Sequence, residues 1–184
     1  MKRQSLTHSR RAFLASAFIL PVAVRAGLSA QTAKPMRIGI IGSGRQGGAL
    51  GLQWAKAGHE VLFSSRNPGN LKDLVAKAGP KARAGTPADA ARFGDVILIA
   101  VPYGELPNVA RDNGALMKGK IVIDVGNPRV DRDGPMAAEA LKKGTGIASA
   151  EYLPGVRLVR ALNALSFVQV ERAAHRSGEK LGVP

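Results

Sequence analysis

The sequence predicts an α/β fold, in which a mostly parallel β-sheet lies between two layers of helices. Apolar segments of strand length alternate with segments in which apolar residues recur every three or four positions. One segment, 95–102 (DVILIAVP), is almost continuously apolar, as expected for a strand that helices cover on both faces. A glycine-rich turn, 42–48, joins the first strand to the first helix. Together these observations indicate a doubly wound, three-layer sheet of the Rossmann type.

The predicted elements follow one another without an internal repeat. Strands are expected at 36–41, 59–64, 82–85, 95–102, 120–125 and 156–162. Helices are expected at 46–57, 71–78, 86–93, 105–113, 136–143 and 166–174. Thr86 and Pro87 begin the third helix, because threonine is a common N-cap and proline fits the first helical position. We expect a turn-rich excursion at 129–134, a loop at 144–148, and a loop at 176–184 that enters another strand.

The glycine turn has the spacing of a dinucleotide-binding motif and lies between an apolar strand and an apolar-faced helix. Gly42 permits the tight turn, Gly44 lets a pyrophosphate approach the backbone, and Gly47 lets the helix pack close to the strand. The N–H groups at the helix start then face the phosphates. The residues predicted to bind the cofactor here are Gly42, Ser43, Gly44, Arg45, Gln46 and Gly47. The alternative is a glycine-rich turn in an ordinary α/β protein.

The residues after the second strand indicate which dinucleotide binds. Proteins that prefer NAD place an acidic residue there to bind the ribose 2′-hydroxyl, and this chain has none. It has Ser65 and Arg66, and Arg66 offers a planar set of donors for a 2′-phosphate. Arg45 in the glycine turn is a second candidate for that phosphate. We therefore predict NADP(H) rather than NAD(H); the alternative is a solvated arginine beside two turn serines.

Two later strand ends are predicted to face the nicotinamide half of the cofactor. Ligands of doubly wound sheets bind beyond the carboxyl ends of the strands. Val101 and Pro102 end the fourth strand, and Asn127 follows the fifth within a Gly-Asn-Pro sequence. The alternative is that both strand ends are plain turns. No acid–base pair stands out in the sequence, so we predict no catalytic residue.

The composition limits the other functions. The chain has 184 residues with a hydrophobic content of 45%, which is typical of one globular domain. It has no cysteine, which excludes disulfides, thiol nucleophiles and cysteine-based metal sites, and its three histidines lie far apart in sequence. We therefore predict no metal site. The formal net charge is +14, but the basic residues are scattered and aromatic residues make up only 4%, so we expect no nucleic acid partner.

The N-terminus has the form of an export signal. Residues 9–14 (SRRAFL) carry a twin-arginine pair, and residues 12–24 form an apolar run that is short for a bilayer span. Segments 24–26 and 28–30 are candidate cleavage sites. We predict a twin-arginine signal peptide at 1–30, a domain at 31–184, a periplasmic location and no stable membrane insertion after cleavage. The alternative is an uncleaved amphipathic helix or a membrane anchor.

With these residues in view, the chain from about residue 36 to 184 resembles the NADP-binding family of deazaflavin-dependent NADP reductases (coenzyme F-420 type). The likeness rests on segments 37–44, 64–66, 100–103, 127–128 and 160–163. It implies that Ser65 and Arg66 hold the 2′-phosphate, and that Val101, Pro102 and Asn163 lie towards the nicotinamide and the second substrate. Family members carry a longer C-terminal part, so we expect this chain to be a truncated or minimal member.

The expected function is that of an NADP(H)-binding oxidoreductase that transfers hydride between the nicotinamide and a small-molecule acceptor. A deazaflavin coenzyme is one candidate co-substrate. Transfer of this kind needs orientation and exclusion of water more than acid–base help from the protein. The alternatives are a non-catalytic NADP-binding module, such as a redox sensor or partner subunit, and a reductase of an imine or ferric acceptor. A homodimer is one candidate for the oligomeric state.

Overall fold

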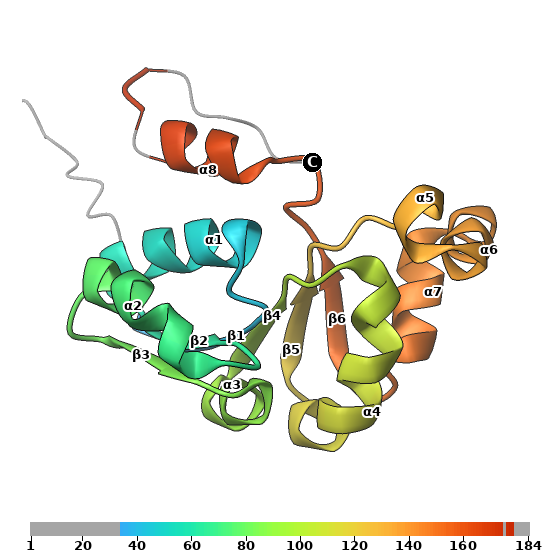
Figure 1. Cartoon of the computed structure of the whole chain (residues 1–184), viewed down its shortest axis with the longest axis horizontal. Coiled ribbons are helices and arrows are strands. Elements are labelled where there is room, and N and C mark those ends of the chain that lie inside the picture. Colours follow the sequence, from blue (N-terminus) through green and yellow to red (C-terminus); the bar gives the residue numbers. More distant parts are fainter. Residues whose placement is uncertain (1–33, 175, 179–184) are drawn as a thin grey trace, which may run out of the picture. The chain divides into compact units, whose positions relative to one another are not determined.

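The computed structural model describes residues 34–174 and 176–178. Figure 1 shows how their helices and strands are arranged. The predicted signal peptide at 1–30 lies outside the described residues, as do residues 179–184 of the loop predicted at 176–184.

Six strands form one sheet in the order β3-β2-β1-β4-β5-β6, and every pairing is parallel. The strands are β1 (Arg37–Ile41), β2 (Glu60–Ser64), β3 (Ala82–Gly85), β4 (Val96–Ile99), β5 (Ile121–Asp124) and β6 (Arg157–Arg160). Strand order reverses between β1 and β4, which is the point where doubly wound sheets bind their ligands. The predicted α/β fold with a parallel sheet is confirmed.

Helices cover both faces of this sheet, which confirms the three layers (Figure 1). The helices are α1 (Arg45–Lys56), α2 (Lys72–Ala78), α3 (Pro87–Phe93), α4 (Leu106–Met117), α5 (Val130–Asp133), α6 (Pro135–Lys143), α7 (Thr145–Tyr152) and α8 (Phe167–Ala173), with the 3-10 turns η1 (Pro68–Leu71) and η2 (Tyr103–Glu105). One apolar core joins α1, α2 and α8 to the sheet, and the other joins α3, α4, α6 and α7. Alternate residues of β4 separate these cores, because Leu98 enters the first and Ile97 and Ile99 enter the second.

The start of α3 is as predicted. The Thr86 hydroxyl accepts a hydrogen bond from the backbone N–H of Asp89, and the Asp89 carboxylate accepts one from the N–H of Thr86. This capping box satisfies two N–H groups that would otherwise lack partners. Pro87 occupies the first position of the helix.

Three predicted segments are wrong. A loop was expected at 144–148, but helix α7 occupies 145–152. Two residues of this helix, Ala148 and Ser149, are buried, and their packing favours the helix. Helix α4 runs to Met117 rather than 113, since Met117 is fully buried and extends the apolar stripe. The excursion at 129–134 contains the short helix α5. Tertiary packing accounts for the first two cases, because α7 and α4 bury side chains, whereas α5 buries none.

No helix within residues 34–174 and 176–178 is long and apolar enough to cross a bilayer. The same part of the chain contains no cluster of three or more histidine, aspartate or glutamate side chains arranged to hold a metal ion.

Candidate functional site

A cavity of about 440 Å³ opens at the carboxyl edge of the sheet, beside the reversal of strand order. One wall comes from the turns after β1, β2 and β4, and the opposite wall comes from α4. Several of the predicted binding residues line it, namely Gly42, Ser43, Gly44, Ser65, Arg66, Val101 and Pro102. The fold therefore brings together residues from three separate strand ends at the place where a dinucleotide is expected.

The three glycines of the turn differ in what surrounds them. Gly42 has φ +96°, a left-handed conformation that favours glycine. A Cβ added at Gly47 would overlap the carbonyl oxygen of Gly42 and lie 3.1 Å from Ile40 Cγ2. A Cβ added at Gly44 would meet no atom within 4 Å. Gly42 and Gly47 thus serve the fold, whereas the space at Gly44 is open to a ligand.

The glycine turn is tied to the end of β2. The Ser43 N–H donates to the Ser64 carbonyl at 3.0 Å, and the Ser64 N–H donates to the Ser43 hydroxyl at 2.8 Å. Gly44 is the N-cap of α1 and has no side chain to cap the helix. The first N–H groups of α1 thus lack a side-chain cap, and with the positive end of the helix dipole they favour an anion.

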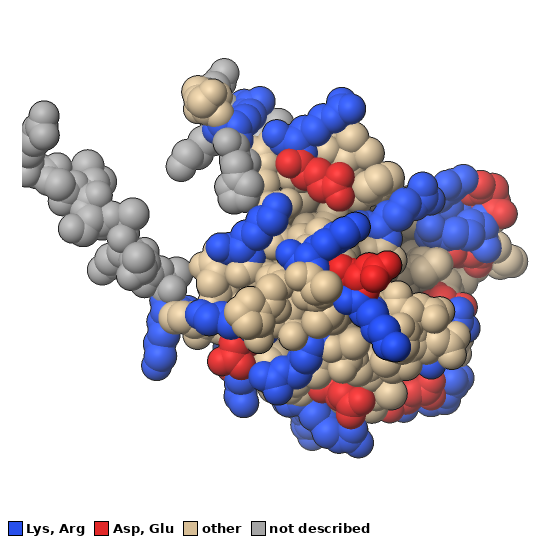
Figure 2. All heavy atoms as spheres, turned by 60° about the vertical axis from the view of Figure 1, so that its left-hand side comes forward, with Lys and Arg blue, Asp and Glu red and all other residues tan. Residues whose placement is uncertain are grey.

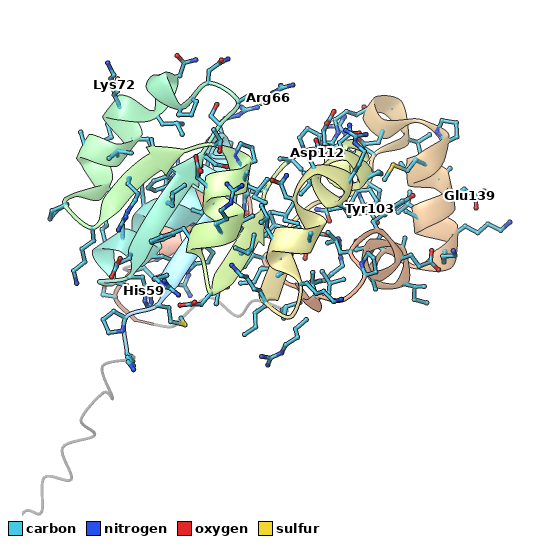
Figure 3. The ribbon with its side chains drawn as sticks, turned by 90° about the horizontal axis from the view of Figure 1, so that it is seen from below. His59, Arg66, Lys72, Tyr103, Asp112 and Glu139 are labelled. Atoms are coloured by element: carbon cyan, nitrogen blue, oxygen red, sulfur yellow. The ribbon has the colours of Figure 1, made fainter. Side chains whose placement is uncertain are left out.

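The end of β2 carries a cation that is free to bind. Arg66 is exposed and makes no hydrogen bond or ion pair with any residue that the structure describes. The neighbouring Ser65 hydroxyl accepts a hydrogen bond from the Asn67 N–H at 3.1 Å, so its own hydrogen remains available as a donor. Figure 3 shows Arg66 on the loop after β2 and Asp112 on α4, the two walls of the cavity.

Four predicted binding residues do not line the cavity. Gly47 is buried beneath the turn. Arg45 lies over the ring of Phe167, 5.2 Å from its centre, and the Gln46 amide donates to the Leu165 carbonyl at 3.1 Å. The Asn127 amide donates to the Asn163 carbonyl at 2.8 Å. In this arrangement the side chains of Gln46 and Asn127 hold the segment before α8, and that of Arg45 contacts the first residue of α8.

The segment between β6 and α8 is also held from its own side. Leu162 has φ 63°, which is unusual for a residue with a side chain. The Asn163 amide that follows donates to the carbonyls of Asp124 and Gly126, both at 3.3 Å. The ends of β5 and β6 are therefore cross-linked next to Asn127, the residue predicted to face the nicotinamide.

A buried ion pair beneath these strand ends was not predicted. Arg160 donates to the Asp124 carboxylate at 2.5 Å and to the Gly126 carbonyl at 2.7 Å. The Ser149 hydroxyl donates to the same carboxylate at 2.8 Å and lies 3.1 Å from the Tyr103 hydroxyl. Burial raises the pKa of Tyr103. Asp124 and Arg160 are paired in the β5–β6 register, and opposite charges at the last positions of two neighbouring strands are the signal that could have revealed them.

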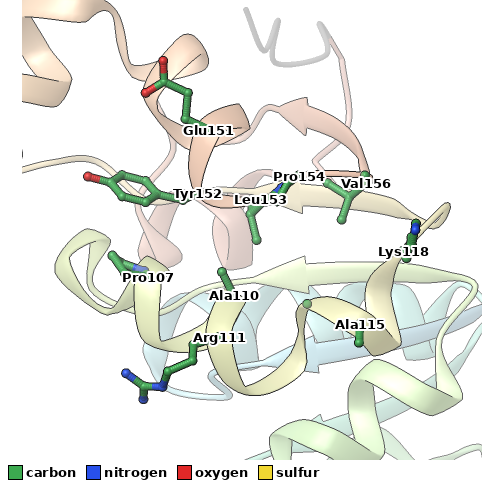
Figure 4. A pocket seen from close by; sticks show the side chains of 12 residues that line it. Pro107, Ala110, Arg111, Ala115, Lys118, Glu151, Tyr152, Leu153, Pro154 and Val156 are labelled. Carbon is green, nitrogen blue, oxygen red and sulfur yellow. The ribbon is translucent and has the colours of Figure 1, made fainter.

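A second hollow of about 660 Å³ lies between α4 and the segment 151–156 (Figure 4). Two of its three charged side chains have partners, because Arg111 pairs with Asp112 and Glu151 pairs with Lys143, and the third is Lys118. The remaining wall is largely apolar, with Pro107, Leu153 and Val156 among its residues. This hollow lies away from the glycine turn, so the first cavity is the candidate site.

Basic side chains are distributed over the surface in separate groups, with acidic side chains between them (Figure 2). Many of the cations are neutralised locally, as in the exposed pairs Arg37–Asp95 and Arg83–Glu60. Arg66 differs from these in having no such partner among the described residues.

Solved structures share this fold. A candidate F420-dependent NADP reductase from Arthrobacter sp. FB24 is 21% identical, with a TM-score of 0.57 over 73% of this chain and 65% of that one. A hypothetical protein from Sinorhizobium meliloti is 25% identical, with a TM-score of 0.57 over 74% and 65% of the two chains. An imine reductase from Myxococcus stipitatus in complex with NADP+ is 19% identical, with a TM-score of 0.53 over 72% and 43%. The matched region thus spans about 65% of the first two proteins.

The sequence itself matches a family model over residues 37–128, which is half of the chain. That segment begins at β1 and ends after β5, and it contains every residue that lines the cavity. The family is described as the NADP oxidoreductases that depend on coenzyme F420. By this match, the chain belongs to the coenzyme F420-dependent NADP oxidoreductase family.

Proposed function

We propose that the cavity binds NADP(H) through its adenosine half. The observation that carries this proposal is that two features line the same cavity. At Gly44 an added side chain would meet no other atom, and Arg66 is an exposed cation without a partner among the described residues. The N-terminus of α1 would hold the pyrophosphate, and Ser65 with Arg66 would hold the 2′-phosphate. The residues present fit this cofactor.

In this proposal the protein is an oxidoreductase that uses the bound cofactor with a small-molecule acceptor. The nicotinamide supplies or accepts a hydride when it is bound. Val101 and Pro102 would shield one side of the ring from water, and the strand ends near Asn127 would orient it, since Asn163 and Arg160 hold them in place. A deazaflavin is the acceptor that family membership favours.

The cofactor assignment is tested by Arg66→Ala. We expect NADPH binding to weaken by roughly ten- to a hundredfold while NADH binding hardly changes, because only NADPH offers the 2′-phosphate for a charge-assisted hydrogen bond. Lys72→Ala is the matched control, since Lys72 is an exposed cation of a neighbouring element that does not line the cavity (Figure 3). Equal losses for both nucleotides, measured by fluorescence titration, would contradict the assignment to NADP.

A non-catalytic NADP-binding module is the second candidate. The purified domain should be assayed for NADPH oxidation with deazaflavin, flavin, imine and ferric acceptors in turn. Turnover with any of them would exclude the module, and tight NADPH binding without turnover would favour it.

We also propose that the protein is exported to the periplasm by the twin-arginine route. The support is the Arg10–Arg11 pair followed by an apolar run. Changing both arginines to lysine should leave an uncleaved protein in the cytoplasm, as measured by fractionation and mass. Unchanged periplasmic yield would refute this location.

A further inference from the structure

Helix α8 lies against α1 with little buried surface of its own. The two helices are in contact (Figure 1), yet Val170 is the one residue of the seven in α8 that is buried. A helix of this length is not stable by itself in water. Its capping box joins Ser166 to Gln169 within the same turn, so it does not attach α8 to the rest of the protein. The position of α8 therefore depends on the segment that leads into it.

This segment, residues 162–167, is here called the strap. It is held by three side chains that the sequence predicts to bind the cofactor, namely Arg45, Gln46 and Asn127. Leu162, the first residue of the strap, has φ 63°, and a residue with a side chain adopts this conformation only at a cost in free energy. Contacts with other segments, rather than the preference of its own backbone, thus keep the strap in place.

Arg45 is the one of these three that carries a charge. Its side chain is exposed, and the ring of Phe167 is the partner of its guanidinium among the described residues. Arg45 directly follows Gly44, the N-cap of α1, where uncapped N–H groups favour an anion. A charge-assisted hydrogen bond to a phosphate oxygen is stronger than a cation–π contact at an exposed site. A diphosphate at the start of α1 would therefore win Arg45 from the ring.

We propose that Arg45 is a latch between the cofactor site and α8. In the free protein Arg45 holds Phe167, and with it the first turn of α8. When the diphosphate of the cofactor binds, Arg45 turns to the diphosphate and α8 is held less firmly. This inference rests on the proposed binding of NADP(H) and adds a conformational response outside the cavity. Because such coupling is reciprocal, the docking of α8 weakens cofactor binding by the same factor.

Hydrogen exchange of the α8 amides, followed by NMR, tests the latch. The N–H groups of Val170 and Ala174 donate within the helix at 3.0 and 3.2 Å, so they exchange when α8 opens. Saturating NADP+ should speed their exchange about two- to fivefold, which is the factor that corresponds to a lost cation–π contact of about 0.5–1 kcal/mol. Saturating adenosine 2′-phosphate, which has no diphosphate, should leave the exchange unchanged.

Two variants remove the latch from its two sides. Arg45→Met keeps a long side chain without the charge, so α8 should already exchange faster in the free protein and NADP+ should not speed it further. Phe167→Leu keeps an apolar side chain without the ring. It should tighten NADP+ binding about two- to fivefold, because Arg45 no longer has to leave a partner. The affinity for adenosine 2′-phosphate should stay the same.

Arg172→Met is the matched control, since Arg172 is an exposed cation of α8 outside the latch. It should leave the exchange of α8 and the affinity for NADP+ as they are in the unaltered protein. If Phe167 only stabilised the fold, Phe167→Leu would lower the thermal midpoint without tightening NADP+ binding, and the latch would be refuted.

The remaining outcomes separate the latch from the function on which it rests. If NADP+ binds and the exchange of α8 is unchanged or slower, the latch is refuted and the cofactor assignment stands. The latch is also refuted if NADP+ speeds exchange equally in Arg45→Met, or if adenosine 2′-phosphate has the same effect as NADP+. If the unaltered protein does not bind NADP+ at all, the proposed function fails, and the latch fails with it.

Discussion

Gly44→Val tests whether the glycine turn binds phosphate. The space around Gly44 is open, and its φ of −73° suits any residue, so the new side chain causes no clash in the free protein. The cost to folding is limited to a poorer N-cap, about 1 kcal/mol, or roughly 2–4 °C in the thermal midpoint. Binding should fall at least tenfold, because one lost hydrogen bond to a charged group is worth about 1.5–3 kcal/mol.

Gly47→Ala is the matched comparison, because it makes a smaller change at a position where the fold has no room. Its Cβ would overlap the backbone oxygen of Gly42, and we expect overpacking to cost about 1–3 kcal/mol. Titration with NADPH and NADH, combined with thermal unfolding, separates the two effects. If Gly44→Val binds NADPH within twofold of the unaltered protein, the turn is not a phosphate site and the reasoning fails.

Two further predictions concern stability. The pKa of Asp133 is lowered to about 2 by hydrogen bonds from the Arg132 side chain and from backbone N–H groups, so this carboxylate stabilises the fold above pH 4 and the contribution is lost as the pH falls towards 2. Asp133→Asn should lower the free energy of unfolding by about 2 kcal/mol near neutral pH, and the loss of stability towards low pH, measured by urea unfolding, should become less steep. Asp131→Asn, at an exposed position, should change the free energy of unfolding little. Arg160→Met should lower the free energy of unfolding by roughly 3–5 kcal/mol, because it leaves the buried Asp124 charge unpaired. Adding Asp124→Leu should recover part of that loss. If the losses of the two single variants in urea unfolding simply add up in the double variant, the pairing is contradicted.

The sequence was sufficient for those parts of the fold and site in which local chemistry decides the outcome. The glycine spacing places Gly42 and Gly47 where the backbone has no room for a side chain, and the structure agrees at both. The continuous apolar run became the central strand β4, because only a strand buried on both faces needs such a run. Thr86 formed its capping box for a similarly local reason.

The rest depends on contacts between distant segments. Arg45 and Gln46 lie in the glycine turn, yet their side chains contact Phe167 and Leu165, more than a hundred residues away. Nothing in the local sequence shows that a later segment packs there. The ion pair between Asp124 and Arg160 has the same origin, since it requires knowing that β5 and β6 are neighbours in register.

These distant contacts divide the chain into a part that forms the cavity and a part that supports it. All cavity residues lie between positions 41 and 113, inside the segment that matches the family. Asn163, Leu165 and Phe167 lie after that segment and contact the glycine turn and the end of β5 without entering the cavity. Substitutions after residue 128 therefore act on the candidate site indirectly, through these contacts, rather than by changing the residues that line the cavity.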